Sequence, residues 1–79
     1  MQQIEIYSTQ RCPYCVRAKA LLDTKGLAYS EIDVSANDRL MQHMITRSGQ
    51  RTVPQIFIDG DPVGGFEQLS QLAASGGLD

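Results

Sequence analysis

Hydrophobic side chains alternate with polar ones in short stretches of this chain, and that period predicts β-strands. Ile4 and Ile6 flank Glu5 and precede a β-favouring tyrosine, so residues 4–7 form the first predicted strand. Three further strands are predicted at residues 29–33, at residues 55–58 and, after an Asp-Gly turn, around Val63. The last two are close enough in sequence to form a hairpin.

Other stretches repeat their apolar positions every three to four residues, as amphipathic helices do. Pro13 suits the first helical position and Gly26 the position after the last turn, which predicts a helix over residues 13–25. A second helix is predicted behind residues 35–38, which resemble a capping box opened by Ser35. The third predicted helix, residues 66–74, follows a Gly-Gly pair.

The order of these elements, β-α-β-α-β-β-α, predicts an α/β fold. A β-α-β start implies parallel strands joined by a right-handed crossover, whereas a hairpin adds an antiparallel pair. We therefore expect one four-stranded mixed sheet with three helices distributed over both faces, forming a single domain over residues 1–79.

Composition excludes several classes of protein. The chain has 79 residues, 42% hydrophobic and 20% charged, which is the balance of an ordinary globular domain. A formal net charge of −2 provides no basic face for nucleic acid. No apolar run approaches the ~18 residues of a membrane span, and the N-terminus lacks the features of a signal peptide. We expect a cytoplasmic protein, monomeric because no surplus apolar stripe is present.

The two cysteines, Cys12 and Cys15, are separated by only two residues. A disulfide that closes so small a ring restricts the unfolded chain little, by about 2 kcal/mol on the chain-entropy estimate. The pair is therefore poorly placed to stabilise the fold and well placed for redox chemistry.

Cys12 falls at the N-cap of the first predicted helix, where unpaired amides and the helix dipole favour thiolate over thiol. Arg11 and Arg17 add positive charge nearby, and Cys15 lies one turn further along. This arrangement indicates a nucleophilic thiol followed by a resolving thiol. Two alternatives remain at this point: half of a zinc or iron–sulfur site, or two cysteines that merely fill the core.

Three motifs in order resemble the glutaredoxin family. They are Cys-Pro-Tyr-Cys at residues 12–15, Thr-Val-Pro at residues 52–54 and Gly-Gly at residues 64–65. Residues 50–60 are similar to the same segment of the bacterial class-one, dithiol members. The resemblance covers nearly the whole chain.

The resemblance implies a thioredoxin-like fold and a disulfide oxidoreductase that uses glutathione as co-substrate, with no metal and no tightly bound cofactor. It implies that Cys12 attacks glutathione–protein mixed disulfides, and that Cys15 resolves protein disulfides by forming the redox-active disulfide Cys12–Cys15. The implied partners are glutathione and glutathionylated or disulfide-containing proteins, ribonucleotide reductase among them.

The resemblance also implies a glutathione groove. The backbone of Val53 would pair with the cysteinyl part of glutathione, beside Pro54. The γ-glutamyl end would lie at the start of the last helix. Many family members carry a lysine where this chain has Thr9, and Arg11 is the candidate substitute. The groove residues expected in this way are Arg11, Tyr14, Thr52, Val53, Pro54, Gly65, Phe66 and Glu67.

Two other functions fit parts of the sequence. A thioredoxin-like redoxin of this size would draw its electrons from a flavoprotein reductase in place of glutathione. An iron–sulfur carrier would use Cys12 and glutathione from two subunits, although Pro13 and Cys15 argue against it. The source of electrons separates the first of these from a glutaredoxin, and bound iron separates the second.

Overall fold

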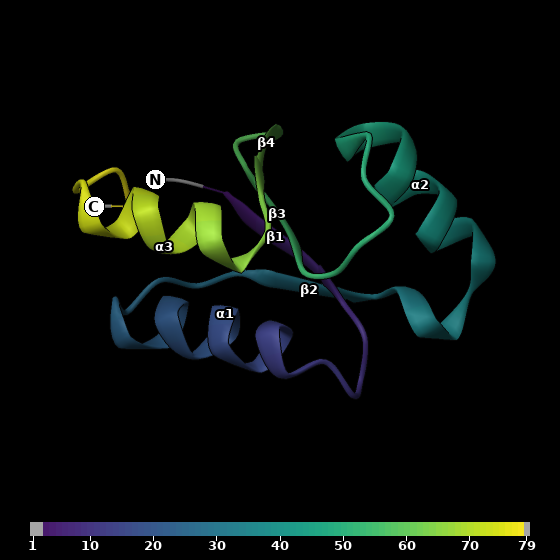
Figure 1. Cartoon of the computed structure of the whole chain (residues 1–79), viewed down its shortest axis with the longest axis horizontal. Helices are drawn as coiled ribbons and strands as arrows, with labels where there is room; N and C mark the ends of the chain where they lie inside the picture. Colours follow the sequence, from purple (N-terminus) through teal and green to yellow (C-terminus); the bar gives the residue numbers. More distant parts are fainter. Residues whose placement is uncertain (1–2, 79) are drawn as a thin grey trace.

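The computed structural model describes residues 3–78 and is built on one mixed β-sheet (Figure 1). The elements in chain order are β1 (Ile4–Ser8), α1 (Pro13–Thr24), β2 (Ser30–Asp33), the 3-10 turn η1 (Val34–Ala36), α2 (Asp38–Ser48), β3 (Gln55–Ile58), β4 (Asp61–Gly64) and α3 (Phe66–Ala74). The strand order is β2-β1-β3-β4, with β1 parallel to β2 and the other pairs antiparallel. The predicted α/β fold and its element order are confirmed.

Helices cover both faces of the sheet, because successive strand residues point to opposite sides (Figure 1). On one face, Ile6 and Ile56 pack with Leu22 of α1 and Leu69 of α3. On the other face, Tyr7 and its neighbours pack against α2, whose Met44 is fully buried. Two small cores therefore hold three helices to one sheet.

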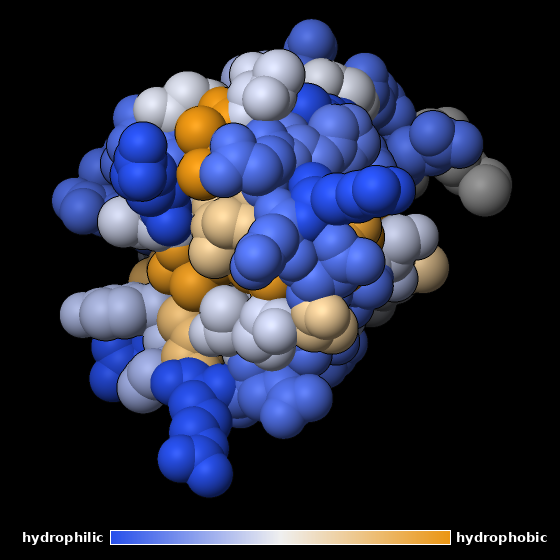
Figure 2. All heavy atoms as spheres, turned by 90° about the vertical axis from the view of Figure 1, so that its right-hand side faces the viewer, coloured by the Kyte–Doolittle hydropathy of each residue, from blue (hydrophilic) through white to orange (hydrophobic). Residues whose placement is uncertain are grey.

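Polar contacts of the Arg47 side chain link α2 to β1. The guanidinium of Arg47 lies 4.0 Å from the ring centroid of Phe57, donates to the Tyr7 hydroxyl at 2.8 Å and contacts Glu5 at 3.1 Å. Burial of the tyrosine hydroxyl is tolerated because this partner satisfies it. Seen from the side on which α2 lies, the surface is mainly hydrophilic with a narrow apolar strip (Figure 2).

The prediction that Ser35 caps the second helix is wrong. Ser35 lies in η1, where its backbone N–H donates to Asp33 Oδ1 at 2.9 Å. Asn37 caps α2 in its place, in an extended conformation, and its Oδ1 accepts the N–H of Arg39 at 2.7 Å. The physical reason is that Val34 must be buried against the core beneath α2, so the chain makes one extra turn before the helix begins.

Candidate active site

Cys12 is the N-cap of α1. Its backbone is extended (φ −112°, ψ 108°), which directs the sulfur back over the first turn, and Pro13 occupies the first helical position. The Cys15 N–H donates to Cys12 Sγ at 3.1 Å. On the other side, the Cys12 thiol contacts the carbonyl oxygen of Val53 at 3.7 Å. A partly exposed sulfur is thus held between a helix N-terminus and the 52–54 segment.

Cys15 is fully buried in the same turn, and the structure describes the pair as two free cysteines. Burial, together with a hydrogen bond to the Cys12 side chain, raises the pKa of Cys15 to about 12. The Thr9 backbone and the Lys19 ammonium oppose this rise only in part. At neutral pH Cys15 is therefore a thiol, and only the partly exposed Cys12 is accessible to an electrophile.

We expect iodoacetamide at pH 7 to modify the native reduced chain at Cys12 alone, because alkylation needs an accessible thiolate. Cys15 should become reactive once the chain is unfolded in denaturant, where both its burial and its raised pKa are lost. Mass spectrometry of peptides after a timed reaction measures this selectivity. Equal modification of both cysteines in the native chain would contradict the buried, protonated state of Cys15.

A shallow groove of about 240 Å³ opens beside the cysteine pair. Three separate parts of the chain form it: the start of α1, the segment before β3 and the start of α3. Its lining residues are Tyr14, Thr52, Val53, Pro54, Gly65, Phe66 and Glu67. The structure thus brings together seven of the eight groove residues expected from the sequence.

Aromatic side chains form one wall of this groove. The Tyr14 ring is 56% exposed, and its centroid is 6.1 Å from that of Phe66. The Arg17 guanidinium lies 5.3 Å from the Tyr14 ring centroid. An exposed aromatic ring held beside a partly exposed sulfur is suited to cover a bound thiol compound.

Backbone geometry shapes a second part of the groove, at residues 52–54. The peptide bond between Val53 and Pro54 is cis. The side-chain amide of Gln55 donates to the Thr52 carbonyl oxygen at 2.9 Å, which holds the segment from inside the protein. Gln55 is buried, and the sequence reasoning missed it because a polar residue in a strand is ordinarily assigned to the solvent side.

The start of α3 forms the end of the groove. Gly64 has φ +121°, and a Cβ there would come within 3.0 Å of the Gln68 side chain, so glycine is required at this position. The Gly65 N–H donates to Gln68 Oε1 at 2.9 Å. The first-turn amides of α3 have no partner within the helix, and they open beside the groove, as an anion-binding end requires.

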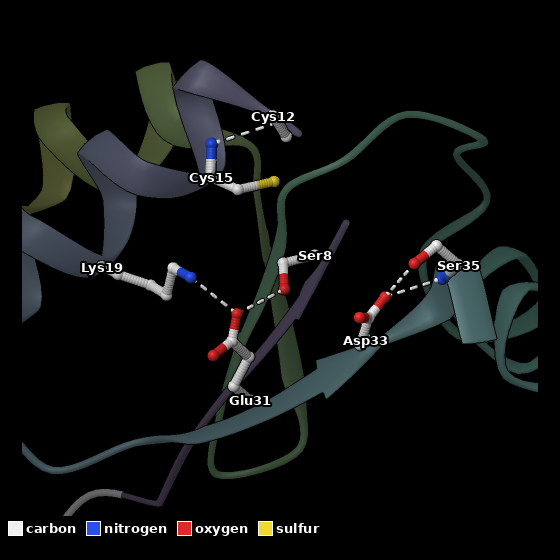
Figure 3. Close-up of polar contacts among 7 residues, drawn as sticks. All are labelled: Ser8, Cys12, Cys15, Lys19, Glu31, Asp33 and Ser35. Atoms are coloured by element: carbon white, nitrogen blue, oxygen red, sulfur yellow. Dashed lines mark hydrogen bonds and ion pairs between the residues drawn. The ribbon is translucent and has the colours of Figure 1, made fainter. Parts of the chain in front are cut away.

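Arg11 is the expected residue that the structure does not place in the groove. It is exposed in the turn before Cys12 and does not contribute to the lining. Beneath Cys15 lies a cluster that the sequence reasoning did not single out: Lys19 and Ser8 both contact Glu31 (Figure 3). Lys19 follows Cys15 by four residues, so helical spacing was the signal that could have placed the two on one face.

Residues 3–78 contain neither a cluster of metal-binding side chains nor a helix that could span a membrane. No three of the histidine, cysteine, aspartate and glutamate side chains in this range come together as a potential metal site. Across the same range, every helix is too short or too polar to cross a bilayer. The described site can support thiol–disulfide chemistry next to a groove.

Comparisons with known proteins agree with one another. The profile of the family described as Glutaredoxin matches residues 4–63. Glutaredoxin 3 of Escherichia coli (strain K12) is 51% identical over 79 residues, covering 100% of this chain and 95% of that protein. The solution structure of glutaredoxin from Brucella melitensis is 49% identical with a TM-score of 0.85, covering 98% of this chain and 84% of that one. The crystal structure of a buckwheat glutaredoxin–glutathione complex has a TM-score of 0.88 at 31% identity, covering 98% of this chain and 73% of that one.

Proposed function

This chain belongs to the glutaredoxin family, and on that premise we propose that Cys12 is its catalytic nucleophile and Cys15 its resolving thiol. The protein is a glutathione-dependent disulfide oxidoreductase with a thioredoxin-like fold. One observation carries the assignment of roles: Cys12 Sγ is partly exposed beside the groove and accepts a first-turn amide, whereas Cys15 is fully buried behind it.

Reduction of a glutathione–protein mixed disulfide needs Cys12 alone. The Cys12 thiolate attacks the glutathione sulfur, the protein sulfur leaves as a thiolate and takes up a proton, and a Cys12–glutathione disulfide remains. A second glutathione thiolate then attacks the glutathione sulfur of this adduct. Cys12 leaves as the thiolate, and the two glutathiones depart as glutathione disulfide, so the electron pair comes from glutathione.

Reduction of a protein disulfide uses both cysteines. Cys12 attacks one sulfur of the substrate and forms a mixed disulfide, while the other substrate sulfur leaves as a thiol. Cys15 then attacks Cys12 Sγ, which releases the second substrate thiol and forms the Cys12–Cys15 disulfide. Two glutathiones restore the dithiol. Cys15 lies one helical turn from Cys12 and its N–H already contacts Cys12 Sγ, which supports this second step.

The groove is proposed as the glutathione site. The backbone at Val53 would pair with the cysteinyl part, in the manner of an added strand, beside Pro54. The first-turn amides of Phe66 and Glu67 would hold the γ-glutamyl carboxylate. The walls would be completed by Tyr14, Thr52 and Gly65. Arg11 is proposed for the remaining, glycyl carboxylate, in place of the family lysine that this chain lacks at Thr9.

Glutathione is a substrate that passes through this site, and no metal or bound organic cofactor enters the proposed chemistry. Glutathionylated and disulfide-containing proteins are the other substrates, and we include ribonucleotide reductase among those proposed. We propose a cytoplasmic monomer in which residues 1–79 form one domain.

The decisive experiment is turnover of a glutathionylated peptide, coupled to NADPH oxidation through glutathione and glutathione reductase. We expect rapid turnover that disappears when glutathione is omitted. Full activity without glutathione, with electrons from a flavoprotein thioredoxin reductase, would overturn the proposal in favour of the redoxin alternative. An anaerobically purified protein that contains iron and shows no turnover would favour the cluster carrier.

A further inference from the structure

A charged cluster lies on the inner side of α1, below the buried cysteine (Figure 3). Lys19 Nζ is 2.7 Å from Glu31 Oε2, and the Ser8 hydroxyl donates to the same oxygen at 2.7 Å. Ser8 is buried at the end of β1, and Glu31 projects from β2. In Figure 3 the Cys15 side chain points from α1 toward the strand that carries Ser8. The glutathione groove uses none of these three residues.

Lys19 and the resolving thiol lie on one face of α1. Cys15 and Lys19 are four residues apart on α1, so their side chains leave the helix on the same face. Lys19 favours the charged form of Cys15 electrostatically, as the Thr9 backbone does by a hydrogen bond. These two interactions oppose the rise in the Cys15 pKa that burial causes, and the Lys19 charge is the smaller of the two.

The pair itself stays charged at neutral pH. The Glu31 carboxylate raises the pKa of Lys19, and Lys19 together with Ser8 lowers the pKa of Glu31. Neither member is therefore poised to take the Cys15 proton as a base. Lys19 also faces Tyr29 and Asp33, and Cys12 faces Cys15 from its own helix.

Formation of a mixed disulfide at Cys12 changes which groups influence the ionisation of Cys15. In the reduced protein, Cys12 disfavours a Cys15 thiolate through both a hydrogen bond and its charge. Once Cys12 is joined to a substrate sulfur, it carries no charge, and both contributions are removed. The ammonium of Lys19 then remains as a favourable charge on the side of α1 that carries the attacking thiol.

We propose that Lys19, held in place by Glu31 and Ser8, is a positioning residue for the resolving step, because its ammonium stabilises the Cys15 thiolate while Cys12 is in a mixed disulfide. The inference rests on the proposed roles of Cys12 and Cys15. It assigns Lys19 to the dithiol reaction and to no step of the monothiol reaction.

The step balances without a further reactant. Cys15 releases its proton to solvent, and the thiolate attacks Cys12 Sγ. The bond between Cys12 and the substrate sulfur breaks as the Cys12–Cys15 bond forms. The substrate sulfur leaves with the electron pair of the broken bond and takes a proton from solvent, so the cysteine pair is oxidised and the substrate reduced. Water reaches the charged pair, which lines an open depression of about 390 Å³.

The test is a rapid-mixing experiment on the whole chain. The reduced protein is mixed with saturating glutathione disulfide and quenched in acid at successive times. Mass spectrometry then measures conversion of the Cys12–glutathione adduct to the Cys12–Cys15 disulfide. We expect Lys19→Gln to slow this conversion by about threefold to tenfold at neutral pH. The variant should hold a smaller fraction of Cys15 as thiolate, and the greater intrinsic nucleophilicity of that more basic thiolate should offset part of the loss. The pH profile should move to higher pH, because loss of a cation disfavours the anion.

Charge variants separate this effect from mere packing. Lys19→Arg should restore the rate. Glu31→Gln should not slow it, because the amide oxygen of glutamine can still accept hydrogen bonds from Lys19 and Ser8 while the opposing charge is removed. Lys25→Gln removes the same charge from the exposed C-terminal end of α1 and should leave the conversion unchanged. Coupled monothiol turnover of a glutathionylated peptide should be unaffected in every variant.

The experiment distinguishes failure of the role proposed for Lys19 from failure of the proposed function. A wild-type rate and pH profile for Lys19→Gln would overturn the role of Lys19 while leaving the cysteine assignments intact. Equal slowing by Lys19→Gln and Glu31→Gln would also overturn it, because it would indicate loss of local structure. A native chain that forms no Cys12 adduct would overturn the proposed function itself.

Discussion

Replacing Cys12 with serine is expected to abolish reduction of both glutathionylated and disulfide-bonded substrates. A serine hydroxyl at the N-cap keeps the helix capped, but at neutral pH it is not ionised and does not attack a disulfide. Loss of a catalytic nucleophile commonly lowers kcat by about a thousandfold or more. The NADPH-coupled assay measures the loss, and circular dichroism checks that Cys12→Ser is folded.

Cys15→Ser is the matched variant, one helical turn away. It should keep most of the turnover on a glutathionylated peptide, because glutathione itself clears the Cys12 adduct. It should lose most of the reduction of a protein disulfide, because no thiol remains to resolve the mixed disulfide. A trapped Cys12–substrate adduct should then appear in non-reducing gels. Equal loss of both activities in Cys15→Ser would contradict the assignment of roles.

The second large effect concerns stability, and it arises at Leu69 on the inner face of α3. Leu69 is fully buried and packs with Ile6, Leu22 and Ile56, between the sheet and α1. We expect Leu69→Ala to lower the free energy of unfolding by about 2–5 kcal/mol, from lost burial and from the cavity left behind. Alanine is the best helix former, so the loss does not arise from helix propensity.

Urea or guanidinium unfolding, followed by circular dichroism, measures this change. A domain of this size has a total stability of roughly 4–12 kcal/mol, so Leu69→Ala should shift the midpoint strongly. Ser70→Ala, at the adjacent exposed position, is the control and should change stability by no more than about 0.5 kcal/mol. A Leu69→Ala effect no larger than that of Ser70→Ala would contradict the two-core arrangement.

The elements of the fold could be predicted because their signals are local. Alternation at Ile4 and Ile6, Pro13 at the start of α1 and the Gly-Gly pair before α3 each act within a few residues. The same locality explains the one misplaced cap. Ser35 and Asn37 are both good N-cap residues. Asn37 is the cap in the structure because Val34 is buried against the second core, and that contact joins segments that are distant in sequence.

Spacing along the chain was enough to recognise the cysteine pair, its position at a helix start and the family motifs. How the site is assembled could be seen only once the chain was folded. The tertiary structure joins Tyr14, Val53 and Phe66 in one groove, leaves Arg11 outside it, and sets Lys19 and Glu31 beneath Cys15. The reason is physical: the reactivity of a thiol depends on its burial and on nearby charges, and these come from segments that only folding brings together.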